Sequence, residues 1–371
     1  MLTLMGTQSA YFGPSKYGIL PEMLRDDDLP QANGIIQMTT FLAIILGTAL
    51  AGYGKELAGN GLWKIGLICV VIAIAGTLTS LFIRKTPVAK PDLQFQISSL
   101  AINKSTRSML WNDRPLLMVL LISSLFWFIG GAVLPSVNKL GKELMHLGDG
   151  RTSLLAACMG FGIGLGCLLA GKLSRNEINF RLVRVGAWGI VVCLIVVPFF
   201  GVNVHPDTSL TDSSVETVEQ NGSDTTGEAT VEEAPIVVDP HLNENLWQKL
   251  IPESFWEFGA RLTLTLVGLF AGLFAVPLQT FMQTRPPADQ KGQMIGAMNL
   301  INWIGILLSS AFLAQVLNEL QNLELSSKWC FPVLALLMVP VALFFKPPSE
   351  KLLHQVAVDH TPHEEETAET P

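Results

Sequence analysis

The chain has 371 residues, of which 15% are charged and 49% are hydrophobic, and its mean hydropathy is +0.42. Soluble domains carry about 25% charged residues, so this composition excludes an ordinary soluble enzyme. Thr152–Gly171 and Leu262–Thr284 contain no charged residue, and each is long enough to cross a bilayer. Because backbone polar groups in lipid must be satisfied within a segment, these spans predict an all-α polytopic membrane protein.

The formal net charge of −7 is unevenly distributed. The segment 203–254 contains eleven acidic residues and one basic residue, and the tail 356–371 contains five acidic residues. The rest of the chain therefore carries a formal charge of +8. Both acidic segments have few large apolar side chains, and we expect them to be disordered. The five cysteines lie in or beside apolar segments without paired spacing, so we expect no disulfide framework and no metal site.

Nine spans are predicted in chain order. They are residues 2–24, 32–52, 62–83, 115–136, 152–170, 182–202, 258–283, 293–316 and 329–345. Gly13-Pro14 and Pro21 interrupt the first span on either side of Lys16. The helix bundle is thus predicted to have a partial N-terminal half (1–83), a cytoplasmic central loop (84–114), a six-span C-terminal half (115–345, with the acidic extracytoplasmic insertion 203–254) and an acidic tail (346–371).

The central loop has two features of local structure. Apolar residues alternate with polar ones over 93–110, which predicts an interfacial helix. Asn112-Asp113-Arg114-Pro115 then gives the fourth span a capping residue and an early proline.

The distribution of Lys and Arg predicts the orientation of the spans. If the central loop is cytoplasmic, alternation places 15 of the 24 Lys and Arg residues on the cytoplasmic side. They are Arg25, Arg84, Lys85, Lys90, Lys104, Arg107, Arg114, Lys172, Arg175, Arg181, Arg184, Arg285, Lys291, Lys346 and Lys351. We therefore expect an outside N-terminus and a cytoplasmic C-terminus.

Lys16 lies between two otherwise apolar runs in the segment QSAYFGPSKYGILPEML. A cation inside a span costs roughly 2.5–3.5 kcal/mol, and such residues usually face a bundle interior or an aqueous path. The alternative is a lysine that reaches the headgroup layer from a helix end. We favour the interior position because apolar residues continue on its C-terminal side.

Several polar residues in or beside the spans allow both a functional and a structural interpretation. Glu22 either pairs with the nearby lysine, carries a coupled proton or is a solvated carboxylate at a helix end. Asn299 and Asn302 lie one helical turn apart, and they either line a cavity or hydrogen bond between helices. Gln37 and Gln279 allow the same two interpretations. The candidate substrate-binding residues are Lys16, Tyr17, Glu22, Gln37, Asn299 and Asn302.

Three local patterns have structural rather than catalytic interpretations. The run Gly160–Gly166 resembles a nucleotide loop but lies inside an apolar span with no preceding strand, so it predicts close helix packing. Arg261 is expected to extend to the headgroup layer with Glu257, one turn earlier, as its partner. His354 and Asp359 have the spacing of an acyltransferase motif but lie in the acidic tail. We expect no enzyme activity, no cofactor and no nucleic-acid partner.

A weak internal repeat relates Pro21–Gly52 to Phe281–Ala314, since each places a charged turn before a span rich in small residues. Such repeats are typical of secondary transporters. This plan resembles the major facilitator superfamily. Three runs are similar to its bacterial lysophospholipid transporter branch: YFGPSKYGILPEML followed by ANGIIQMTTFLAIILGTALAG, then QTRPPADQKGQMIGAMNLINWIGILLSSA, and SLFWFIGGAVLPSVNKLGKELM.

The resemblance covers most of the chain apart from the acidic insertion and the tail. Members of this branch have twelve spans, so the chain resembles spans four to twelve, and we expect its start to be placed too late. The resemblance implies movement of lysophospholipids, chiefly lysophosphatidylethanolamine, across the bacterial inner membrane for re-acylation. It also implies membrane lipids and an acyltransferase or acyl-activating enzyme as partners, and a phosphate contact at Lys16. Some relatives carry a basic residue in the span at Leu116–Pro135, where this sequence has none before Lys139.

Two other functions are alternatives. A facilitator-type exporter of small amphipathic compounds would bind no lysolipid. A transport-dead scaffold for an acyltransferase is favoured by the three spans that the resemblance leaves unmatched.

Overall fold

The computed structural model describes residues 2–58, 61, 63–84, 86, 104–174, 178–201, 250–287 and 290–345. The predicted acidic tail, most of the predicted acidic insertion and most of the predicted central loop lie outside these residues. Within the described ranges the regular elements are helices, and no strand is present.

Eleven helices and three short turns follow one another along the described chain. They are α1 (Leu2–Gly18), α2 (Leu20–Met23), the turn η1 (Asp26–Asp28), α3 (Leu29–Ala58), α4 (Trp63–Ser80), α5 (Lys104–Asn112), α6 (Arg114–Lys139), the π-helical turn η3 (Leu140–Leu144), α7 (Asp149–Leu173), α8 (Arg181–Phe200), α10 (Phe255–Thr284), α11 (Lys291–Asn322), the turn η5 (Ser327–Trp329) and α12 (Cys330–Phe344).

Eight segments of the described chain, containing α3, α4, α6, α7, α8, α10, α11 and α12, are long and apolar enough to cross a membrane. The remaining predicted span, residues 2–24, corresponds mainly to α1, which at 17 residues is at the lower limit for a bilayer helix. The chain is therefore an all-α polytopic membrane protein, with one segment fewer of clear span length than the sequence predicts.

The first span is interrupted at a different place from the predicted one. α1 continues through Gly13 and Pro14 to Gly18, so the predicted break at Gly13-Pro14 is wrong. The break falls at Ile19, because Pro21 in α2 has no N–H and its ring clashes with the carbonyl four residues earlier. That carbonyl belongs to Tyr17. Membrane helices tolerate an interior proline such as Pro14 when neighbouring groups satisfy the freed backbone.

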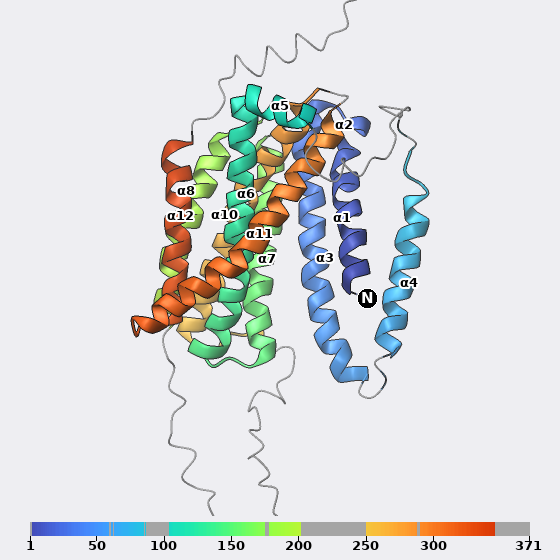
Figure 1. Ribbon diagram of the computed structural model, residues 1–371. Helices are drawn as coiled ribbons and strands as arrows, with labels where there is room; N and C mark the ends of the chain where they lie inside the picture. Colours follow the sequence, from blue (N-terminus) through green and yellow to red (C-terminus); the bar gives the residue numbers. More distant parts are fainter. Residues whose placement is uncertain are drawn as a thin grey trace, which may run out of the picture.

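Figure 1 shows how the helices are grouped. One group contains α6, α7, α8, α10, α11 and α12, and the other contains α1, α3 and α4. α5, α2 and the turn between α10 and α11 lie at one end of the bundle, which we call the α5 end. No residue of α4 is buried, so its apolar surface suits contact with lipid.

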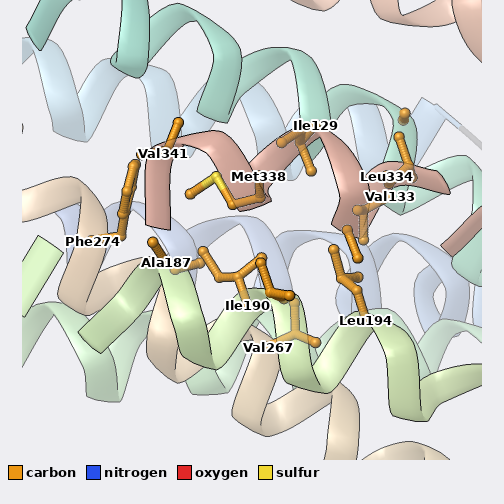
Figure 2. Close-up of a cluster of buried hydrophobic side chains, with 14 of the residues drawn as sticks. Ile129, Val133, Ala187, Ile190, Leu194, Val267, Phe274, Leu334, Met338 and Val341 are labelled. Atoms are coloured by element: carbon orange, nitrogen blue, oxygen red, sulfur yellow. The ribbon is translucent and has the colours of Figure 1, made fainter. Parts of the chain in front are cut away.

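Apolar side chains from four helices fill the centre of the larger group. Figure 2 shows Ile129 and Val133 of α6 with residues of α8, α10 and α12. Those residues are Ala187, Ile190, Leu194, Val267, Phe274, Leu334, Met338 and Val341. Lipid tails are as apolar as these side chains, so close van der Waals packing rather than exclusion from water holds the helices together.

Glycines bring the backbones of α7 and α10 into contact. Gly162 and Gly166 of α7 face Gly268 and Gly272 of α10, and a Cβ at any of the four would overlap backbone atoms of the opposite helix. The spacing of four residues on both helices is the small-residue pattern of close membrane packing. The prediction of helix packing for the glycine-rich run of α7 is confirmed.

We predict that Gly166→Ala lowers the melting temperature of the protein in detergent by at least about 2 °C, because overpacking costs about 1–3 kcal/mol. Gly76→Ala is the matched control, since nothing lies within 4 Å of a Cβ at that position of α4. Alanine is the better helix former by about 1 kcal/mol, so the control should melt at the same temperature or higher. Equal melting temperatures for both variants would contradict the close contact.

Candidate functional site

The side chain of Lys16 crosses from the last turn of α1 to α3. Its Nζ donates a hydrogen bond to Oγ1 of Thr40, and that hydroxyl donates to the carbonyl oxygen of Ile36 at 2.5 Å. Nζ also lies 5.5 Å from the centroid of the Tyr17 ring, within the range of a cation–π contact. The ammonium group is therefore partly buried between two helices rather than extended along the surface.

A cluster of amide side chains joins α1, α3 and α10. Asn33 and Gln283 are both 0% exposed. Asn33 Nδ2 donates to Gln283 Oε1 at 2.5 Å and to Thr280 Oγ1 at 3.3 Å, while Gln283 Nε2 donates to Asn33 Oδ1 at 3.2 Å. Gln283 Nε2 also donates to the Tyr17 carbonyl at 3.2 Å, the group that Pro21 leaves without a helical partner. We call these three side chains and this carbonyl the amide cluster.

Two ion pairs lie near the amide cluster at the α5 end. Arg285 Nε donates to Asp113 Oδ2 at 2.7 Å, and Asp113 also caps α6 by accepting from the Leu116 N–H at 3.2 Å. This capping residue confirms the helix start predicted from the sequence. Lys291 Nζ lies 3.9 Å from Asp26 Oδ1, so the charged turns of the two predicted repeats contact each other.

Glycines also bring α3 close to α7 near this end. A Cβ at Gly34 would overlap the Cys167 carbonyl, and a Cβ at Gly171 would contact the backbone of Gln31 at 3.1 Å. The backbone contact, the amide cluster and the ion pair of Lys291 with Asp26 join the two helix groups at the α5 end.

The structure places the predicted amide residues in different surroundings. Gln37 is 7% exposed, and its Oε1 accepts from Cys167 Sγ at 3.8 Å. Asn302 faces α6, where Ser123 Oγ donates to its Oδ1 at 3.4 Å, so it makes the hydrogen bond between helices rather than a separate cavity contact. Asn299 faces α1, since its Nδ2 lies 3.5 Å from the position of a Cβ at Gly13.

Glu22 is not brought together with Lys16. It is exposed on α2, and the Lys16 ammonium donates to Thr40. Of the six candidates, Lys16 joins α1 to α3 and Asn299 of α11 faces α1, whereas Gln37 of α3 faces α7.

An apolar groove of about 290 Å³ follows one face of α6. Arg114 lies at the end of α6 nearest the α5 end. The groove is lined by Arg114, Leu117, Met118, Leu121, Ile122 and Leu125. A groove with one cation and otherwise apolar walls suits an amphipathic anion better than a polar solute.

A buried charge cluster lies at the start of α7 and α10. Arg151 is 2% exposed, with Nη1 3.1 Å from Glu257 Oε2 and Nη2 2.6 Å from Glu253 Oε1. Arg261 Nη2 lies 2.5 Å from Glu257 Oε1, which confirms the predicted pair. The expected extension of Arg261 to the headgroup layer is wrong, because it is 7% exposed. Arg151 neutralises a second oxygen of the same carboxylate, which holds the group inside the bundle.

Sequence reasoning missed Asn33, Gln283 and Arg151. Asn33 and Gln37 lie one helical turn apart in an apolar span, and so do Gln279 and Gln283. Polar residues that share a helix face within a span are usually turned toward other helices, so this amide repeat was available in the sequence. Arg151 lies beside a span end, and no local spacing relates it to the glutamate that it binds.

Comparisons with known proteins agree with this architecture. A family model described as the Major Facilitator Superfamily matches residues 1–213. The lysophospholipid transporter LplT of Enterobacter sp. (strain 638) is 30% identical over 186 residues, 50% of this chain and 46% of the relative. The LplT proteins of Escherichia fergusonii and Salmonella gallinarum are 30% and 29% identical over 194 and 198 residues, 51% and 52% of this chain and 48% of each relative. The aligned part spans about half the length of these curated relatives.

We predict a measurable coupling between Asn33 and Gln283. Either Asn33→Leu or Gln283→Leu leaves a buried amide without its partner, so each should lower the free energy of unfolding. The double variant should lose less than the sum, with a coupling energy of roughly 0.6–2 kcal/mol. The exposed pair Gln315 and Glu319, 2.7 Å apart, is the control cycle and should show almost no coupling. Strict additivity at Asn33 and Gln283 would contradict the two-way hydrogen bond.

We also predict that Glu257→Gln strongly destabilises the protein, because it leaves two buried guanidinium groups with one carboxylate fewer. Breaking a buried ion pair costs about 3–5 kcal/mol. Glu143→Gln is the control, since Glu143 is exposed and 3.2 Å from Lys139, and exposed pairs contribute about 0–1 kcal/mol. Thermal unfolding in detergent measures both variants, and an equal effect of the two would exclude the buried cluster as a stabilising element.

Proposed function

Because this chain belongs to the major facilitator superfamily, we propose that this transporter moves lysophospholipids, of the lysophosphatidylethanolamine type, across the bacterial inner membrane for re-acylation. The observation that carries the proposal is the partly buried ammonium group of Lys16 between apolar helices. The names of the three relatives support the same class of substrate.

The chemistry of the substrate matches this arrangement. A lysophospholipid has one acyl chain and one phosphate, so it needs apolar walls and a small number of cationic or donor groups. Thr40 gives the Lys16 ammonium a neutral partner, and no carboxylate among the described residues forms an ion pair with it. An ammonium group is a compact point charge that can meet a phosphate oxygen, and pairing lowers the cost of keeping a charge inside the bundle. The apolar groove on α6 supports a contact with an acyl chain.

We propose that transport proceeds by alternating access, and the closure at the α5 end supports this proposal. The amide cluster, together with the ion pair of Lys291 and Asp26, joins α1 and the α3 region to α10 and α11. We propose that the α5 end and the C-terminus are cytoplasmic, as the distribution of Lys and Arg predicts. Release of a lysolipid to the inner leaflet then requires these contacts to separate. An acyltransferase or acyl-activating partner is proposed from the resemblance alone.

We predict that Lys16→Gln reduces uptake of headgroup-labelled lysophosphatidylethanolamine into proteoliposomes by roughly tenfold or more. A hydrogen bond to a charged group contributes about 1.5–3 kcal/mol, and 1.4 kcal/mol corresponds to a factor of ten. Lys64→Gln, which removes an exposed lysine from α4, is the matched control and should transport normally. Expression level and elution volume in gel filtration verify that both variants fold.

Normal uptake by folded Lys16→Gln protein would remove Lys16 from the substrate site. Wild-type protein that gives no uptake above protein-free liposomes would contradict lysolipid transport. That result would favour the exporter or the scaffold.

A further inference from the structure

Two buried amide groups close to the amide cluster have no hydrogen-bond partner within the described ranges. They are Nε2 of Gln279, a residue that is 9% exposed, and Nδ2 of Asn299. A buried donor that makes no hydrogen bond costs about 1–3 kcal/mol. Native proteins hold few such groups, and each requires an explanation.

The register of the helices places both amides at the same depth, in one layer of the bundle. α3 and α10 run in opposite directions. Gln37 comes four residues after Asn33 on α3, and Gln279 comes four residues before Gln283 on α10. Gln37 and Gln279 therefore both lie about 6 Å further from the α5 end than the amide cluster does. Asn299 faces Gly13, which lies four residues before Tyr17 on α1 and therefore at the same depth.

The ammonium group of Lys16 enters this layer. Helical side chains point toward the N-terminus of their helix, so the Lys16 side chain points away from the amide cluster. Its Nζ reaches Thr40, which lies three residues after Gln37 on α3. We call Lys16, Gln37, Thr40, Gln279 and Asn299 the donor layer.

The donor layer has more hydrogen-bond donors than acceptors. Lys16 has three N–H donors and uses one on Thr40, and each of the two unpartnered amides offers N–H groups. The Oε1 of Gln37 already accepts from Cys167. The five side chains carry one positive charge and no carboxylate. A ligand that fits here supplies a negative charge and several acceptor oxygens that can be approached from different helices.

We propose that Gln279 of α10 and Asn299 of α11 donate hydrogen bonds to the phosphate oxygens of the substrate, while Lys16 of α1 supplies the opposite charge. The three donors form a phosphodiester subsite. It rests on the proposed function and assigns Gln279, which was not among the six candidates, to the binding of substrate. A tetrahedral phosphate presents oxygens in several directions, which suits donors that come from three helices.

The test measures the affinity of purified protein in nanodiscs for 1-palmitoyl lysophosphatidylethanolamine, with 1-palmitoylglycerol as the probe that lacks phosphate. The variants are Gln279→Met and Asn299→Leu, which keep approximate size and remove the donors. Gln315→Met on α11 is the control, because that amide is exposed and bound to Glu319. We expect each variant to weaken lysophospholipid binding by roughly tenfold. Palmitoylglycerol should bind all proteins equally.

Stability provides a second readout. Replacing an unpartnered donor with an apolar group removes its desolvation cost, so Gln279→Met and Asn299→Leu should melt at the wild-type temperature or higher. If one of them does not fold, Gln279→Glu, which replaces donors with a negative charge, should fail to bind the lysophospholipid.

The outcomes separate this subsite from the proposed function. Wild-type binding that neither variant changes overturns the subsite and leaves the lysolipid function in place. A lower melting temperature with unchanged binding assigns the two amides to packing and also overturns it. Wild-type protein that binds no lysophospholipid overturns the proposed function and the subsite together.

Discussion

Pro21 cannot donate a backbone hydrogen bond, and this missing bond leaves the Tyr17 carbonyl free inside an apolar bundle. A membrane offers no water to satisfy such a group, so another part of the protein has to do so. Gln283 of α10 donates to it and is itself held by Asn33 of α3. One proline thereby requires α1 and α3 to meet α10 at the α5 end, although Gln283 lies 266 residues after Tyr17 and 250 after Asn33.

The next layer of the bundle differs from the amide cluster in its balance of polar groups. In the amide cluster, Asn33 and Gln283 both donate and accept, and both are fully buried. One turn further from the α5 end, Nε2 of Gln279 and Nδ2 of Asn299 have no hydrogen-bond acceptor in the described part of the chain. Lys16 adds a positive charge to this layer. The first arrangement closes the bundle without a ligand. The second is proposed to bind a ligand that brings acceptors.

Local patterns in the sequence predicted much of the fold. Hydropathy located the spans, Asp113 was identifiable as a cap, and the spacing of Arg261 from Glu257 predicted their pair. Contacts set by helix crossing could not be predicted, because the period of a helix gives a face but no partner. Arg151 binds Glu257, which lies 106 residues later in the chain. Its guanidinium adds a second positive charge beside Glu257, which explains why the pair of Arg261 and Glu257 is buried. The amide repeats of α3 and α10 indicated polar faces, but only the antiparallel crossing of these helices selects Asn33 and Gln283.

The most direct test of alternating access is to lock the α5 end. Asp26→Cys and Lys291→Cys, introduced in a variant without the five native cysteines, replace the ion pair between η1 and α11 and leave the amide cluster intact. A short, reducible thiol cross-linker should stop lysophosphatidylethanolamine uptake into proteoliposomes, and reduction should restore it. Full uptake by completely cross-linked protein would contradict the claim that these contacts separate during transport.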